Sequence, residues 1–181
     1  MRSFLERRGV MVDGIEFRAQ VPVNVRARSE QGKLGNRVAT LVARLPLDEP
    51  DARRRYLRVL ETTRTLKDSK QVRGSELLEA LGDWTAKELL AGIVRMTSQG
   101  LAFNMTVTNV PGPPFAAYLL DAPMQAIFPV VPLFSNQGVG IALFSYHGRL
   151  FWGFNACWDA VPDLHDLVLA VQREFETLRK L

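Results

Sequence analysis

The amino-acid sequence predicts a mixed α/β fold in a single domain that covers residues 1–181, and three observations support this. Segments 17–26, 36–45 and 103–110 are short and rich in apolar and β-branched residues, as strands are. Segments 52–70 and 162–178 carry apolar residues at helical spacing. Residues 139–157 have the pattern of a β-hairpin. We therefore expect about five or six strands combined with helices.

The composition is that of a globular protein, with 47% hydrophobic and 23% charged residues. A single cysteine excludes an internal disulfide, and one cysteine with two histidines argues against a zinc site. No apolar run approaches the roughly 20 residues of a membrane-spanning helix, and residues 1–8 have no signal-peptide pattern. We expect a cytoplasmic protein that holds no metal and no cofactor.

The first third of the chain predicts a helix, two strands and a second helix. Helix 3–8 ends at Gly9, which we expect to form its C-cap. Strand 17–26 contains Pro22, which indicates an edge position or a bulge. A polar turn precedes strand 36–45, and a loop at 46–51 leads into helix 52–70.

The second helix is strongly basic. Segment 51–73 contains eight basic and three acidic residues: Arg53, Arg54, Arg55, Arg58, Arg64, Lys67, Lys70 and Arg73 against Asp51, Glu61 and Asp68. A cationic helix can attract the phosphates of a coenzyme, of nucleic acid or of a membrane surface. A solvated helix face is the other interpretation. The basic residues are not interleaved with aromatic ones, so we do not expect binding to single-stranded nucleic acid.

The middle of the chain predicts two further helices and two strands. Helix 75–81 is followed by Thr85 and Glu88 at capping-box spacing, and the next helix runs to about Gly100. Strand 103–110 comes next. The apolar segment 124–134 is interrupted by Pro129 and Pro132, and we expect a strand with a bent end.

The hairpin is the clearest local prediction. His147 and Gly148 form a two-residue turn that needs φ above zero at both positions, which glycine adopts freely and histidine tolerates. We expect four cross-strand pairs: Leu143 with Trp152, Ile141 with Phe154, Gly140 with Asn155 and Ala142 with Gly153. The first two pairs predict a core face. The other two form a lane of small residues that another backbone or a ligand can approach closely.

Residues with catalytic potential are few. His147 lies in the predicted turn and His165 at the start of the last helix, and neither has a serine or cysteine at a motif-like distance. We expect both histidines to be structural or exposed. Cys157 follows an apolar strand without a neighbouring histidine, and we expect a buried, inert thiol.

Strand 103–110 carries a polar lane. Period-two geometry places Asn104, Thr106 and Thr108 on one face. Hydroxyl and amide groups in such a lane can donate hydrogen bonds to a carbonyl oxygen that becomes negative during acyl transfer. Alternatively they face water or satisfy neighbouring backbone. The strand then exits through Pro111-Gly112-Pro113, a stiff turn because proline fixes φ and glycine tolerates positive φ.

Four segments in this order resemble the C-terminal half of the bacterial wax ester synthase/diacylglycerol acyltransferase family. They are Val21-Pro22-Val23-Asn24-Val25-Arg26, Leu34-Gly35-Asn36-Arg37, Asn109-Val110-Pro111-Gly112-Pro113 and Ser145-Tyr146-His147-Gly148-Arg149-Leu150. The resemblance implies a fold like that of chloramphenicol acetyltransferase, in which two α/β halves enclose a tunnel for acyl-CoA and for a fatty alcohol or diacylglycerol. Each half has a mixed sheet with helices packed on one side. The family's His-His-x-x-x-Asp-Gly motif, whose histidine acts as general base, belongs to the other half and is absent from this chain.

By this resemblance the chain forms the second wall of the tunnel. Thr106, Thr108, Asn109 and Gly112 are then the substrate-binding residues, Asn36 braces a strand crossover, and no residue of this chain is catalytic. The expected partner is an N-terminal acyltransferase half or a second copy, without nucleic acid, in the cytoplasm or peripherally on a membrane or lipid inclusion. The chain alone is not expected to be active. The alternative function is that of a non-catalytic binding or assembly module that pairs with a partner chain.

Overall fold

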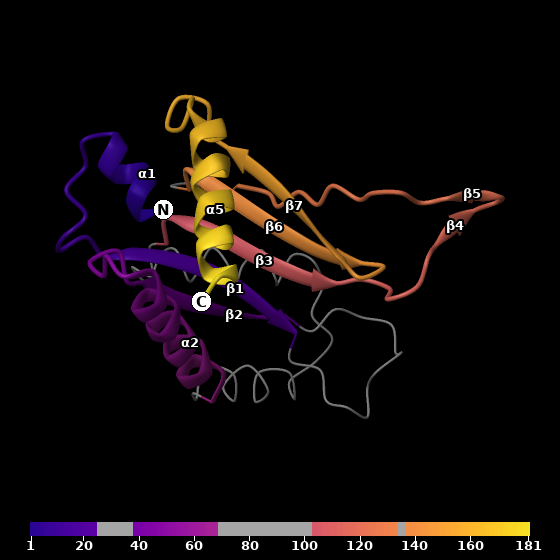
Figure 1. Ribbon diagram of the computed structural model, residues 1–181, viewed down its shortest axis with the longest axis horizontal. Coiled ribbons are helices and arrows are strands. Elements are labelled where there is room, and N and C mark those ends of the chain that lie inside the picture. The colour runs from indigo at the N-terminus through magenta and orange to yellow at the C-terminus, as the bar shows by residue number, and fades with distance from the viewer. Residues whose placement is uncertain (25–37, 69–102, 134–136) are drawn as a thin grey trace, which may run out of the picture.

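The computed structural model of the chain describes residues 1–24, 38–68, 103–133 and 137–181. A five-stranded mixed sheet in the order β2-β1-β3-β6-β7 forms its centre (Figure 1). The strands are β1 (Phe17–Asn24), β2 (Val38–Leu45), β3 (Met105–Pro111), β6 (Val139–Tyr146) and β7 (Arg149–Ala156). The three inner strands are mutually parallel, whereas β2 and β7 run antiparallel to their neighbours.

Three described helices, α1 (Arg2–Arg7), α2 (Ala52–Asp68) and α5 (Leu164–Arg179), cover one face of this sheet (Figure 1). Phe4 of α1 and Leu167 of α5 are buried together with Ile141 and other apolar residues of the sheet. Removing these side chains from water is the main stabilising contribution, at about 2 kcal/mol for each large one. The expected mixed sheet with helices on one side is confirmed, and strand and helix bounds agree within a few residues.

The hairpin of β6 and β7 is confirmed in its turn and in its register. His147 and Gly148 have φ of 46° and 73°, the left-handed values that this turn requires. All four predicted cross-strand pairs are observed. Trp152 and Phe154 stack with their ring centroids 6.0 Å apart, and both rings pack against the core beneath the helices. The turn residues and the alternation of large and small side chains therefore predicted the strand pairing correctly.

Gly9 lies where its local chemistry predicts, whereas the edge position expected from Pro22 is found only locally, because β1 is an inner strand without a bulge. Gly9 has φ of 73° and its N–H donates to the Glu6 carbonyl, while Val10 N–H donates to the Leu5 carbonyl, both at 3.0 Å. This pair of bonds is the Schellman end of a helix. Pro22 lies in the part of β1 beyond Gln20, where β1 is paired with β2 but no longer with β3. Its missing N–H therefore costs no bond to β3.

The predicted strand 124–134 is wrong. Residues 124–133 belong to neither described sheet. Pro129 and Pro132 cannot donate to a ladder, and the segment packs against Gly140 and Gly153 on one face of the sheet. The sequence also missed a small antiparallel ribbon of β4 (Tyr118–Leu119) and β5 (Ala122–Pro123). This ribbon projects far from the sheet (Figure 1).

The prediction of a buried Cys157 is also wrong, since this residue is exposed. It comes directly after the end of β7, where the chain turns toward α5. Its N–H donates to the Gly138 carbonyl and its carbonyl accepts from Val161 N–H. These bonds hold the backbone of Cys157 against the protein, and the thiol is left exposed to solvent. The predicted helices 75–81 and 85–100, with the capping box, and Asn36 lie outside the described residues.

Candidate functional site

Asn104 fixes the start of β3, the strand expected to face the substrate. Its Oδ1 accepts a hydrogen bond from the Arg18 N–H, and its own N–H donates to the Arg18 carbonyl, both at 2.8 Å. These bonds join the entry of β3 to β1, with which β3 pairs over two residues. The Asn104 side chain thus satisfies a neighbouring backbone group, which is the alternative to donating hydrogen bonds to a substrate.

Thr106 belongs to a buried polar cluster with Gln20 and Gln137. Its hydroxyl lies 3.1 Å from Gln137 Oε1 and 3.3 Å from Gln20 Oε1, and Gln137 Nε2 donates to Gln20 Oε1 at 3.3 Å. All three side chains are buried. Gln20 lies next to Thr106 in the parallel register, so alternation along β1 could have identified it, whereas Gln137 carried no comparable signal. Such a network stabilises the sheet when every member is bonded.

Thr108 and Asn109 lie nearer to the exit of β3. The register pairs Thr108 with Ala142 and Asn109 with Leu143, and Leu143 packs under the helices. Asn109 therefore lies on the helix-bearing face, while Thr108 shares the opposite face with Thr106. Thr108 is half-buried and Asn109 is exposed. Within the described part of the chain no hydrogen-bond partner is found for the Thr108 hydroxyl.

Gly112 connects the exit of β3 to the β6–β7 hairpin by a backbone hydrogen bond. Its N–H donates to the Ser145 carbonyl at 2.9 Å, and Pro113 O accepts from His147 N–H at 3.1 Å. A Cβ at residue 112 would lie 2.2 Å from Phe144 Cε1 and 2.4 Å from the Ser145 carbonyl oxygen. Glycine is thus required for close approach, and the expectation that positive φ explains it is wrong, since Gly112 is not among the residues with positive φ.

The lane of small residues on the hairpin is covered by the chain itself. A Cβ at Gly153 would lie 1.7 Å from the Pro129 carbonyl oxygen, and one at Gly140 would lie 2.7 Å from Val131 Cγ1. Asn155 Nδ2 donates to the Val131 carbonyl at 2.8 Å. The predicted close approach of a second backbone is confirmed, and the backbone is segment 129–133. This part of the face is therefore closed to a ligand.

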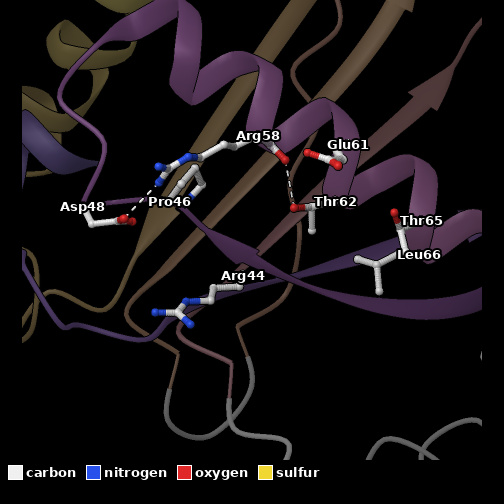
Figure 2. Close-up of a pocket in the computed structure, with 8 residues that line it drawn as sticks. All are labelled: Arg44, Pro46, Asp48, Arg58, Glu61, Thr62, Thr65 and Leu66. Carbon is white, nitrogen blue, oxygen red and sulfur yellow. Dashed lines mark hydrogen bonds and ion pairs between the residues drawn. The ribbon is translucent and has the colours of Figure 1, made fainter.

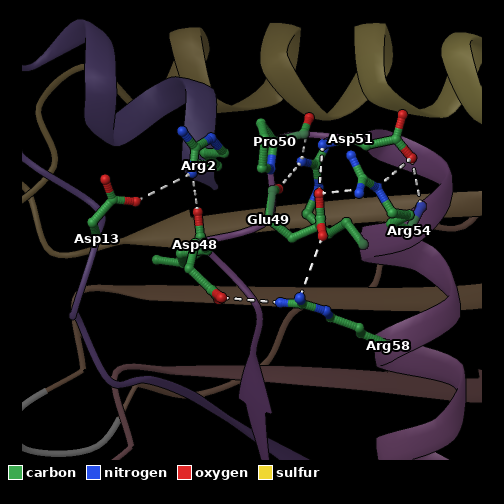
Figure 3. A network of polar contacts seen from close by, with 10 residues as sticks. Arg2, Asp13, Asp48, Glu49, Pro50, Asp51, Arg54 and Arg58 are labelled. Carbon is green, nitrogen blue, oxygen red and sulfur yellow. Dashed lines mark hydrogen bonds and ion pairs between the residues drawn. The ribbon is translucent and has the colours of Figure 1, made fainter.

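The basic helix α2 is bound to its acidic neighbours by a network of ion pairs (Figure 3). Arg58 Nη1 lies 2.9 Å from Asp48 Oδ2, and its Nη2 lies 3.4 Å from the buried Glu49. Arg54 also pairs with Glu49, and Arg55 pairs with Glu174 of α5. The hydrogen bond from Arg58 lowers the pKa of Asp48 below its ordinary value of 3.8. The pair thus stabilises the fold at neutral pH, and this contribution is lost as the pH falls through the lowered pKa.

A cavity of about 580 Å³ lies between α2 and the end of β2 (Figure 2). Its charged lining is of mixed sign, with Arg44 and Arg58 beside Asp48 and Glu61. Arg44 also lies 3.7 Å from Glu16. Because these arginines already have acidic partners, the cavity is a poor site for a phosphate, and the structure favours the solvated-face interpretation of the basic helix.

The two histidines are both exposed, His147 in the hairpin turn and His165 in the first turn of α5. Among residues 1–24, 38–68, 103–133 and 137–181, no group of three or more His, Cys, Asp and Glu residues could hold a metal ion. No helix in the same ranges is both long and apolar enough to span a membrane.

Comparison with known proteins identifies what this arrangement is similar to. Residues 34–179 match the WS/DGAT C-terminal domain. A putative diacylglycerol O-acyltransferase of Mycobacterium tuberculosis is 33% identical over 176 residues, which are 93% of this chain and 35% of the relative. An O-acyltransferase of Acinetobacter baylyi is 26% identical over 159 residues, 87% of this chain and 34% of the relative. The chain thus spans about a third of the length of these curated relatives.

The fold has a counterpart among solved structures. The wax ester synthase/diacylglycerol acyltransferase of Marinobacter aquaeolei VT8 superposes with a TM-score of 0.68 at 19% identity, covering 99% of this chain and 41% of that enzyme. Identity at this level establishes the fold alone. The match of residues 34–179 to the domain establishes more: this chain belongs to the wax ester synthase/diacylglycerol acyltransferase family, of which it represents the C-terminal half.

Proposed function

We propose that this chain forms one wall of an O-acyltransferase site that takes acyl-CoA together with a fatty alcohol or diacylglycerol. The observation that carries the proposal is the accessible end of β3, where the Thr108 hydroxyl has no partner in the described part of the chain and lies beside the stiff exit at Gly112. The relatives are O-acyltransferases by name. Peripheral attachment to a membrane or lipid inclusion is part of the proposal, because both acceptors are lipids.

In this mechanism a base on a second acyltransferase half removes the proton from the acceptor hydroxyl. The alkoxide oxygen attacks the thioester carbonyl of acyl-CoA, and the carbonyl oxygen becomes negative. The Thr108 hydroxyl donates a hydrogen bond to this oxyanion, with Gly112 lining the approach. Asn109 lies on the opposite face of β3 and has no part in this step. Collapse of the intermediate forms the ester bond and breaks the carbon–sulfur bond, and the protonated base returns its proton to the leaving CoA thiolate.

The base is assigned to the second half because neither of the two histidines of this chain lies on β3. His147 lies in the hairpin turn with a φ of 46°, and its N–H donates to the Pro113 carbonyl. His165 lies on α5. Thr106 is assigned a positioning role, since its hydroxyl is buried in the cluster with Gln20 and Gln137. It keeps β3, and with it Thr108, in a fixed register.

The proposal is tested by assaying the release of CoA from palmitoyl-CoA in the presence of hexadecanol. The purified chain alone should show no release above a blank without protein. The chain co-expressed with the part of the M. tuberculosis relative that lies outside the matched region should show turnover. Release by the chain alone that scales with its concentration, or no release by the co-expressed pair, would contradict the proposal.

A further inference from the structure

A second cavity, of about 520 Å³, lies on the helix-bearing face of the sheet, where α1, α2 and α5 meet the end of β2. Its main apolar lining residues are Leu45 of β2, Trp152 of β7, Val59 of α2, and Val171, Phe175 and Leu178 of α5. Ligand sites in proteins have volumes of about 300–1,000 Å³ and predominantly apolar linings. The cavity therefore has the size and the lining of a small-molecule site.

The hydrophobic core is incomplete beside this cavity. Leu45, Trp152 and Val171 pack against the core, yet all three are only half-buried. Trp152 meets the Phe175 ring edge to face, with the ring centroids 6.4 Å apart, and Phe175 is itself 50% exposed. Tyr56, on the α2 side, is 52% exposed. Apolar side chains from the sheet and from both helices thus border one space and retain surface that another apolar group can cover.

The charged side chains of the lining are paired with one another. Arg55 of α2 pairs with Glu174 of α5, and Arg2 of α1 lies 2.7 Å from Glu6. Arg55 also donates to the Glu49 carbonyl at 2.6 Å. The described lining contains no other charged side chain, so it offers a charged ligand no unpaired opposite charge. Because an uncompensated charge is costly to bury, the cavity is complementary to a neutral occupant.

The cavity is elongated along the two helices. Its lining runs from Ala170 to Leu178 on α5 and from Ala52 to Val59 on α2. At a rise of 1.5 Å per residue these spans are roughly 10–12 Å long. A helix of a partner protein, about 10 Å wide, would need on the order of 900 Å³ over this length, which is more than the cavity holds. A single hydrocarbon chain is much narrower, and an apolar cavity of only about 150 Å³ already binds benzene.

We propose that the cavity between α2 and α5 binds the hydrocarbon chain of a neutral lipid, such as a long-chain alcohol. Trp152 lies on the helix-bearing face of the sheet, whereas Thr108 lies on the opposite face. The site is therefore separate from the candidate acyl-transfer site. The inference goes beyond the proposed function and does not rest on it, because the cavity belongs to this chain alone and needs no second half.

The test is the binding of decan-1-ol to the purified chain, with decanoate as the charged counterpart of the same length. Decan-1-ol should raise the melting temperature with increasing concentration, since a ligand that binds only the folded state stabilises it. Decanoate should bind at least about tenfold more weakly, because its carboxylate has no unpaired cation in the lining. Intermolecular nuclear Overhauser effects between the alcohol methylenes and the Trp152 indole should place the ligand in the cavity.

Val59→Phe fills the cavity from the α2 side and should weaken the binding of decan-1-ol by about tenfold or more. The melting temperature without ligand should be kept or raised, as is usual when a cavity is filled. Val171→Phe makes the same change from the α5 side. Val168→Phe is the matched control, because Val168 is also half-buried on α5 but does not line the cavity. It should bind decan-1-ol like the wild type.

The proposal would be overturned by a wild-type chain that decan-1-ol does not stabilise, or by equal binding of decan-1-ol and decanoate. Undiminished binding in the filled variants would overturn it as well. If neither filled variant folds, the Overhauser effects decide, and their absence at Trp152 in the presence of saturating alcohol contradicts the site. A protein contact in place of a lipid site would appear as loss of co-purification of Val59→Phe, but not of Val168→Phe, with the other acyltransferase half, while the alcohol does not bind. None of these outcomes changes the CoA-release assay, which tests the proposed function separately.

Discussion

At the scale of the residue, Thr108 is the position where the proposed mechanism makes its sharpest prediction. Thr108→Val keeps the shape and β preference of the side chain but removes the hydroxyl. In the two-part enzyme it should lower turnover by a factor on the order of 100, as expected for the loss of one donor to an oxyanion. The melting temperature should change little, because the hydroxyl has no partner within the described chain. Steady-state CoA release and thermal unfolding measure the two effects.

Thr106→Val is the companion variant with the opposite expectation. It removes the hydroxyl from a buried cluster and leaves a glutamine amide short of a hydrogen bond, at a cost of about 1–3 kcal/mol. It should lower the melting temperature while turnover per folded enzyme stays close to that of the wild type. Full turnover in both variants would remove β3 from the mechanism. A specific rate loss in Thr106→Val alone would reverse the assignment of the two threonines.

The sequence indicated these candidates but could not rank them. Period two correctly placed Thr106 and Thr108 on one face. The resemblance grouped Asn109 with them, whereas the register places Asn109 on the opposite face. Period two gave no information on which hydroxyl is covered, since that depends on Gln20 and Gln137, which are distant in the chain. The same limit explains the error at Cys157, because exposure at the end of a strand is decided by how the next loop turns.

At the scale of the element, the hairpin shows where local chemistry suffices. The turn His147-Gly148 and the alternation of large and small residues were enough to predict the register of β6 and β7. No knowledge of their contacts with other elements was needed. Segment 124–134 shows the opposite case. Its apolar composition suggested a strand. Its prolines keep it out of the sheet, and it packs instead on the lane of small residues at Gly140 and Gly153. The sequence predicted the lane and the segment separately but did not connect them.

The contact between this segment and the hairpin yields an element-scale prediction. Gly153→Ala would place a Cβ 1.7 Å from the Pro129 carbonyl oxygen, which is backbone and cannot rotate away. The segment must shift, and we expect a loss of about 1–3 kcal/mol in the free energy of unfolding, the usual cost of overpacking.

Gly138→Ala is the matched control for that change. A Cβ there meets only side-chain methyl groups, the nearest at 3.6 Å, and the backbone φ is not positive. Its stability should stay within about 0.5 kcal/mol of the wild type. Chemical denaturation of both variants measures the difference. Equal stability of Gly153→Ala and Gly138→Ala would contradict the close packing of segment 129–133 on β7.

At the scale of the whole molecule, the fold class and most element bounds could be predicted, whereas the ribbon of β4 and β5 could not. Strands and helices follow from hydrophobic periodicity because each buries one face against its neighbours. The ribbon of β4 and β5 buries almost nothing within the described chain, so the two strands are marked by no alternation of buried and exposed positions. A surface that packs against nothing in the described chain has no internal packing from which it could be predicted.

That unpartnered surface leads to a prediction for the chain in solution. Residues 113–128 expose the large side chains of Leu119, Leu120 and Phe128, and burying apolar surface gains about 25 cal/mol per Å². We therefore expect the isolated chain to self-associate as its concentration rises. Because the proposed function requires a second acyltransferase half, adding that half should convert the self-associated species into a mixed complex. Sedimentation velocity over a range of concentrations, with and without the other half, measures both steps. A monomer at high concentration that the other half leaves unchanged would show that the exposed side chains bind neither partner, and the chain would then have to act without the second wall that the proposed mechanism requires.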